Sequence, residues 1–162
     1  KLMKKILKET IRVRLDIRKK DPLASNLGHT FGHAIEKVTN FEVNHGDAIS
    51  VGIVMALEFG VSVGLVDKHY KNSTVELMRK LELNTKVSKD LDLDLLNKTM
   101  LTDKKSSNTH IRLVLIKKTG EPYINKGNYF YSVRPTEMSE FLNIFMNNND
   151  YFDINHWEKL KQ

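Results

Sequence analysis

The stretch that decides the fold is DAISVGIVMALEFGVSVG, residues 47–64. Drawn as a helix, it is apolar around most of its circumference, and Glu58 is the one charge after its first residue. A helix that is hydrophobic on nearly all sides needs other elements packed around it. The sequence therefore predicts a buried central helix over residues 47–64.

Amphipathic patterns on both sides of this stretch predict a mainly helical domain. Helical spacing of apolar residues predicts further helices over about 2–17, 27–38, 68–81, 91–101 and 136–146. Asp21-Pro22 should end the first, because proline lacks an amide hydrogen and disfavours helix in the residue before it. Ser25 or Asn26 is the expected N-cap of the second.

A short β-structure is expected between the last two helices. IRLVLI at 111–116 and TGEPYI at 119–124 alternate in polarity, and glycine at position 120 can supply the turn. The sequence predicts one β-hairpin here, within a single helical domain over residues 1–146. Residues 147–162 are expected to be a C-terminal tail.

Composition excludes several kinds of site. The 162 residues contain no cysteine, which rules out disulfides and thiolate ligands and fits a reducing compartment, so we expect a cytoplasmic protein. No run approaches the roughly 20 apolar residues of a membrane span. The net charge of +6 is spread along the chain, so no nucleic-acid partner is expected. The basic run 12–20 fits a solvated helix face, a polyanion site or a small phosphorylated substrate.

Three of the six histidines, His29, His33 and His45, fall within seventeen residues. His29 and His33 are four apart, so on a helix they share one face. An HxxxH pair alone is more often structural, but His45 at the start of the buried helix strengthens a Zn²⁺ site. Two histidines are not a complete site, and Asp47 and Glu36 are local candidates for a third ligand or for carboxylates that orient the imidazoles. Nearby glycines indicate either close ligand approach or tight helix packing.

Two segments carry a specific resemblance. NLGHTFGHAIE at 26–36 and HGDAISVG at 45–52 resemble the two characteristic segments of 3-dehydroquinate synthases and related sugar-phosphate cyclases. The likeness extends more loosely to DKK at 103–105, before the predicted hairpin. The fold that this resemblance implies is the multi-helix C-terminal domain of the dehydroquinate synthase-like fold, mainly α with a small β-hairpin. An N-terminal NAD-binding domain would lie upstream, absent from this chain.

The resemblance also implies roles for individual residues. His29 and His45 would be ligands of Zn²⁺ or Co²⁺, with a third ligand, a glutamate, upstream. The other implied residues would bind substrate and its phosphate: Asn26, His33, Lys104, Lys105 and Arg14. His33 is also the catalytic candidate. Arg14 stands where the family commonly has a lysine, and an arginine can still pair with a carboxylate, in a different geometry.

The implied activity is that of 3-dehydroquinate synthase in the shikimate pathway. It is a metal- and NAD⁺-dependent cyclisation of a seven-carbon sugar phosphate with phosphate elimination. The full-length protein would be a homodimer, and this chain alone would be inactive. The stretch between Pro22 and Asn26 is shorter than in relatives and lacks their carboxylate-binding arginine. That favours the alternative of a cyclase acting on a non-carboxylated substrate such as sedoheptulose 7-phosphate.

Two further hypotheses stay open. One is a metal-dependent alcohol or glycerol-phosphate dehydrogenase, against which the spacing in GHTFGHAIE argues. The other is a non-catalytic dimerisation module with vestigial histidines.

Overall fold

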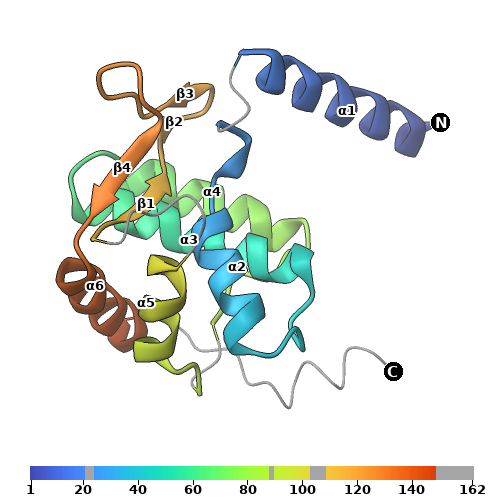
Figure 1. The fold of residues 1–162 in the computed structure, drawn as a ribbon. Coiled ribbons are helices and arrows are strands. Elements are labelled where there is room, and N and C mark those ends of the chain that lie inside the picture. Colours follow the sequence, from blue (N-terminus) through green and yellow to red (C-terminus); the bar gives the residue numbers. More distant parts are fainter. Residues whose placement is uncertain (21–23, 88–89, 103–108, 149–162) are drawn as a thin grey trace.

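The computed structural model describes residues 1–20, 24–87, 90–102 and 109–148 (Figure 1). It confirms a mainly helical domain with little β-structure. In chain order the elements are α1 (Leu2–Lys20), η1 (Ala24–Asn26), α2 (His29–Val38), α3 (His45–Ser62), α4 (Lys68–Lys80), α5 (Leu93–Leu101), β1 (Ile111–Val114), β2 (Ile116–Lys118), β3 (Glu121–Pro122), β4 (Phe130–Val133) and α6 (Pro135–Asn148). The predicted tail begins inside α6, and its residues 149–162 lie outside the described part.

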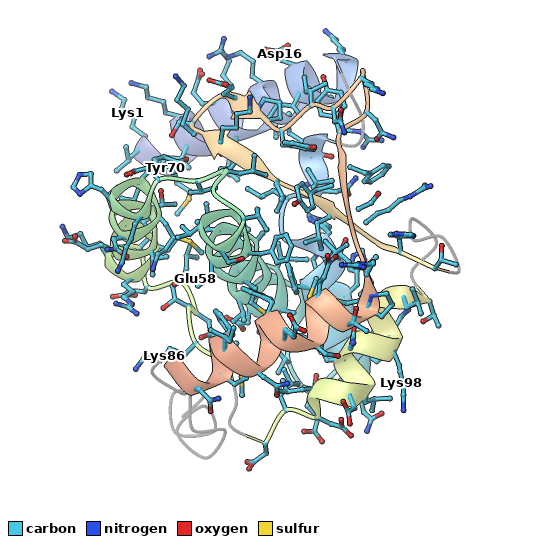
Figure 2. The ribbon with its side chains drawn as sticks, turned by 90° about the vertical axis from the view of Figure 1, so that its left-hand side faces the viewer. Lys1, Asp16, Glu58, Tyr70, Lys86 and Lys98 are labelled. Carbon is cyan, nitrogen blue, oxygen red and sulfur yellow. The ribbon has the colours of Figure 1, made fainter. Side chains whose placement is uncertain are left out.

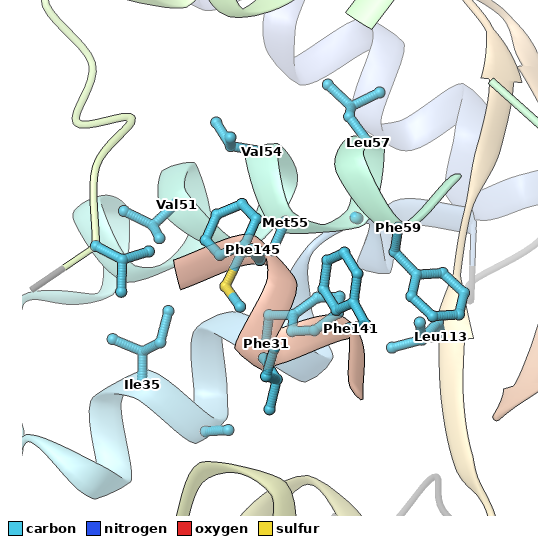
Figure 3. Close-up of a cluster of buried hydrophobic side chains, with 14 of the residues drawn as sticks. Phe31, Ile35, Val51, Val54, Met55, Leu57, Phe59, Leu113, Phe141 and Phe145 are labelled. Carbon is cyan, nitrogen blue, oxygen red and sulfur yellow. The ribbon is translucent and has the colours of Figure 1, made fainter. Parts of the chain in front are cut away.

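The predicted central helix is confirmed as α3. It contacts α2, α4, α6 and β2, and its residues Met55 and Leu57 are fully buried. Figure 3 shows this core, with Phe59 of α3 beside Phe141 of α6. The rings of Phe59 and Phe141 meet edge to face with their centroids 5.1 Å apart, an arrangement that aromatic pairs prefer. The apolar circumference of α3 is thus covered by several elements that lie far apart in the sequence.

Glycines allow α2 and α3 to touch through their backbones. A Cβ on Gly28 would lie 2.5 Å from the amide nitrogen of Ile53, and one on Gly52 would overlap the carbonyl oxygen of Gly28. A Cβ on Gly32 would lie 2.6 Å from the side chain of Ile49. For Gly28 and Gly32, helix packing is therefore the reason for glycine, and the alternative of ligand approach is not needed there.

The predicted N-cap of α2 is wrong. Ser25 and Asn26 belong to the short helix η1, so neither stands next to the first turn of α2. Gly28 takes the N-cap position instead, with a left-handed φ of 75° and no side-chain cap. By contrast α3 begins two residues before the predicted start, because the side chain of Asn44 accepts a hydrogen bond of 3.0 Å from the amide of Asp47.

The predicted single hairpin is only half right. β2 and β3 form a tight antiparallel pair, with Gly120 at φ 76° in the turn between them. β1 instead pairs with β4, a strand that the sequence pattern did not reveal. In this pairing Ile111 faces Val133 and both are buried, so β4 offers β1 an apolar partner.

α1 forms as predicted but packs differently from the other helices. Its contacts are mainly with η1, and Figures 1 and 2 show it along one edge of the molecule. Its apolar side chains are all exposed, from 37% for Ile17 to 72% for Leu2. Asp21-Pro22, the predicted stop, lies outside the described residues. No helix within the described ranges has the length and apolar character needed to cross a membrane.

Candidate functional site

The structure gathers the three clustered histidines into one group. His29 is the first residue of α2, His33 lies one turn further along, and His45 is the first residue of α3. The ring centroids are 5.4 Å apart for His29 and His33, 5.9 Å for His29 and His45, and 6.0 Å for His33 and His45. The predicted convergence of these side chains is therefore present.

The antiparallel packing of α2 on α3 produces this group. Gly28 approaches Gly52 and Gly32 approaches Ala48, so residues further along α2 lie beside the beginning of α3. The loop 39–44 closes the pair, and His45 thereby comes beside the last turns of α2. A second contact ties α2 to the β-structure, because the hydroxyl of Thr30 donates a hydrogen bond of 2.9 Å to the carbonyl of Arg112 in β1.

In two of these rings, a hydrogen bond indicates which nitrogen carries the proton. Nδ1 of His29 lies 3.2 Å from the carbonyl oxygen of Leu27, and Nδ1 of His45 lies 3.1 Å from Oε1 of Glu36. A carbonyl or carboxylate oxygen accepts, so in the neutral imidazole the proton sits on Nδ1 and the lone pair on Nε2. Both rings therefore favour the tautomer that can coordinate a metal ion through Nε2.

Distance alone selects a slightly different set of ligands. Among the described residues, ligand atoms of His33, Glu36 and His45 all lie within 4.8 Å of one another. Bonds of about 2.0–2.2 Å to zinc would require the outermost pair to move closer. Hydrogen bonding favours His29 with His45, while proximity favours His33, Glu36 and His45. We give more weight to the hydrogen bonds, because the carboxylate of Glu36 already engages the Nδ1 side of the His45 ring. The His29 and His45 pair stays a prediction.

The other predicted site residues are placed unevenly. Arg14 of α1 and His29 line one cavity of about 480 Å³, which Ser25 also borders. Asn26 ends η1, two residues before Gly28, and is half-buried. Lys104 and Lys105 lie outside the described residues.

Sequence reasoning missed some neighbours of the site. Glu9 and Ser25 line the cavity beside His29 without any sequence signal pointing to them. Asp47, a candidate ligand, has its carboxylate against the side-chain amide of Asn44 at the start of α3. Glu36, the other carboxylate that the sequence offers as a candidate, has its Oε1 3.1 Å from Nδ1 of His45.

Comparisons with known proteins identify the family of this chain. The family model for the 3-dehydroquinate synthase C-terminal region matches residues 1–106. A 3-dehydroquinate synthase of Vesicomyosocius okutanii subsp. Calyptogena okutanii is 39% identical over 100 residues, covering 61% of this chain and 28% of that protein. Another, of Ruthia magnifica subsp. Calyptogena magnifica, is 32% identical over 130 residues, covering 76% and 36%. The chain thus spans about a third of the length of these relatives.

Solved structures show the same fold. A crystal structure of 2-deoxy-scyllo-inosose synthase complexed with carbaglucose-6-phosphate, NAD⁺ and Co²⁺ matches with a TM-score of 0.67 and 25% identity, over 80% of this chain and 36% of that one. The 2-epi-5-epi-valiolone synthase of Streptomyces hygroscopicus subsp. jinggangensis 5008, with NAD⁺ and Zn²⁺ bound, has a TM-score of 0.59 and 17% identity, over 77% and 33%. Since the family model covers well over half of the sequence, this chain belongs to the 3-dehydroquinate synthase family and corresponds to its C-terminal domain.

Proposed function

We propose that this chain is the metal- and substrate-binding part of a 3-dehydroquinate synthase. The reaction is the cyclisation of a carboxylated seven-carbon sugar phosphate with elimination of phosphate, dependent on NAD⁺ and a divalent metal. The observation that carries the proposal is the group of three imidazoles, 5.4–6.0 Å apart, at the junction of α2 and α3. They come from the same two segments that resemble the enzymes of this family.

The donor set fits a divalent metal ion. Imidazole nitrogens and a nearby carboxylate suit Zn²⁺ or Co²⁺, and we assign His29 and His45 as the ligands that this chain contributes. When bound, the metal would act as a Lewis acid toward oxygens of the substrate. The third protein ligand and the NAD⁺ site would come from the part of the full-length protein that this chain does not span, since the chain covers about a third of the length of its relatives.

Cationic and amide side chains around the histidines would hold the substrate. We assign His33, Asn26 and the pair Lys104-Lys105 to the phosphate, because imidazolium, amide and ammonium groups all donate to phosphate oxygens. His33 is also the residue we assign to proton transfer at the phosphate. Arg14 lines the cavity beside His29, where its guanidinium could pair with a carboxylate.

A related cyclase is the second candidate. The 2-deoxy-scyllo-inosose synthase structure carries carbaglucose-6-phosphate, a ligand without a carboxylate, and matches over 80% of this chain. The shortened stretch before Asn26 points the same way. A substrate such as sedoheptulose 7-phosphate therefore belongs in the same assay.

Metal analysis tests the site directly. The chain is purified with Zn²⁺ and, separately, with Co²⁺, and its metal content is measured together with that of the full-length protein. We expect one metal per chain in the full-length protein, lost in His29→Ala and in His45→Ala. His69→Ala, an exposed histidine on α4, is the matched control and should keep the metal. A full-length protein without metal at neutral pH contradicts the proposal.

Phosphate release separates the two substrates. The full-length protein is incubated with NAD⁺, metal and either the carboxylated seven-carbon sugar phosphate or sedoheptulose 7-phosphate. Release from the first alone supports 3-dehydroquinate synthase activity, and release from the second alone supports the other cyclase. If neither substrate releases phosphate although the protein contains metal, the cyclase proposal fails while the metal site stands.

A further inference from the structure

Glu36 and His45 form an unequal pair. Nδ1 of His45 lies 3.1 Å from Oε1 of Glu36, across the junction between the last turns of α2 and the first residue of α3. The Glu36 side chain is 13% exposed, whereas that of His45 is 60% exposed. The carboxylate is held between packed helices, but the imidazole has little packing to fix its rotamer.

An imidazole of this kind needs a partner in order to present one particular nitrogen. A hydrogen bond from Nδ1–H to a carboxylate fixes the tautomer and the ring orientation and makes the opposite nitrogen a stronger ligand. In metalloproteins such outer partners matter nearly as much as the ligands themselves. The nearly buried carboxylate of Glu36 is in position to do this for His45.

We propose that Glu36 is the positioning residue for the metal ligand His45, holding its ring with Nδ1 protonated and Nε2 directed to the ion. This role rests on the proposed function, because it presupposes that His45 binds metal. It differs from a direct ligand role of Glu36 within the His33, Glu36 and His45 set. As a positioning residue, Glu36 acts through His45 and leaves His33 to the substrate.

The test compares substitutions at one position. Glu36→Gln keeps an oxygen that can accept from Nδ1–H but removes the charge, and Glu36→Met keeps the length and removes the acceptor. Glu42→Gln is the matched control, because Glu42 is an exposed glutamate in the loop between the same two helices. The free energy of unfolding of each variant shows whether the fold is intact.

The first measurement needs no metal. Imidazole ¹⁵N chemical shifts of His45 are recorded on the metal-free chain, well above the ordinary imidazole pKa of about 6.5. We expect the Nδ1–H tautomer in the unsubstituted chain, in Glu36→Gln and in Glu42→Gln, and its loss in Glu36→Met. A tautomer that does not respond to Glu36→Met overturns the proposal.

The second measurement is metal affinity of the full-length protein, followed through Co²⁺ absorption. Glu36→Met should weaken binding by about 10–100-fold, Glu36→Gln should recover part of it, and His33→Ala should leave it unchanged. If Glu36→Gln and His33→Ala abolish binding as completely as His45→Ala, Glu36 is a ligand and the proposal is wrong. If the unsubstituted protein binds no metal, the proposed function fails, and the tautomer result still decides whether Glu36 positions His45.

Discussion

α1 and α3 are of nearly equal length, 19 and 18 residues, yet they stand in opposite environments. α3 buries side chains around most of its circumference, while every apolar side chain of α1 is exposed. Both helices are predicted from sequence with similar ease. The contrast shows that apolar periodicity identifies the face that needs covering, without showing whether the partner belongs to the same chain.

The largest effect on the free energy of unfolding is expected at Gly52, where α3 contacts the backbone of Gly28. Gly52→Ala places a methyl group against the backbone of Gly28, where no side chain can move aside. We expect a loss of about 4 kcal/mol or more in the free energy of unfolding, measured by urea denaturation.

The control lies in the same helix. A Cβ on Gly46 would meet only the side-chain oxygen of Asn44, at 3.4 Å. Gly46→Ala should be neutral or stabilise by up to about 1 kcal/mol, because alanine favours helix over glycine. Equal effects at Gly52 and Gly46 would show that the helices are not in backbone contact.

The next largest difference is expected when one apolar side chain is truncated in α3 and one in α1. Leu57→Ala on α3 removes a fully buried side chain and should cost about 3 kcal/mol. Ile11→Ala on α1, where the side chain is 58% exposed, should change stability by less than about 0.5 kcal/mol. Thermal and urea unfolding of the isolated chain measure both. A cost above about 1 kcal/mol for Ile11→Ala would mean that α1 is covered in solution.

Ion pairs should also contribute more to stability at α3 than at α1. Lys71 of α4 donates to Glu58 of α3 at 2.6 Å, with side chains only 13% and 23% exposed. Figure 2 labels Glu58 between these helices. Lys71→Met leaves Glu58 partly buried without its partner, so we expect a loss of about 1–2 kcal/mol.

The matched pair is on α1. Arg12 contacts Glu9 at 2.6 Å, but both side chains are well exposed, at 64% and 46%. Arg12→Met should therefore cost about 0–0.5 kcal/mol, and added salt should reduce even that. Similar losses for Lys71→Met and Arg12→Met would contradict a difference in environment between α3 and α1.

The smallest effect on stability is expected at the exposed ion pair between Arg134 and Glu137 at the start of α6. Hydrogen bonds from the Arg134 side chain and backbone lower the pKa of Glu137 below its ordinary value of 4.5. Because the folded-state pKa is the lower one, the stabilisation is present above the unfolded-state pKa and is lost as the pH falls through the folded-state value.

Unfolding as a function of pH measures this effect. Glu137→Gln should be less stable than the unsubstituted chain at neutral pH, and the difference should begin to shrink near pH 4.5 and vanish once the pH is below the lowered folded-state pKa of Glu137. Glu140→Gln, also exposed on α6, is the control. A difference that persists in acid would assign the effect of Glu137 to packing instead of charge.

The local sequence predicts the helices better than it predicts the β-structure. The positions of α3 to α6 follow from apolar spacing and from the polar residues between them. β4 escapes prediction because its pairing with β1 joins residues that are up to 22 positions apart, such as Ile111 and Val133. Gly28 was not recognised as an N-cap because a left-handed glycine there depends on how closely α3 approaches.

In the candidate site, too, some features follow from the local sequence and others depend on tertiary packing. Spacing predicts that His29 and His33 share a helix face, and the place of His45 at the start of the buried helix adds it to the group. The contact of Glu36 with His45 depends on antiparallel packing of α2 on α3, which spacing alone does not fix. The cavity shared by Arg14 and His29 depends on where η1 directs α1, a matter of tertiary geometry.

The backbone contact between Gly28 and Gly52 also has a mechanical consequence. At a point where two helices touch through their main chains, no side chain lies between them whose change of rotamer could let them slide. α2 and α3 should therefore tilt as one rigid body if the domain moves, and His29, His33 and His45 would travel with them. Any such movement would leave the mutual spacing of the three rings unchanged.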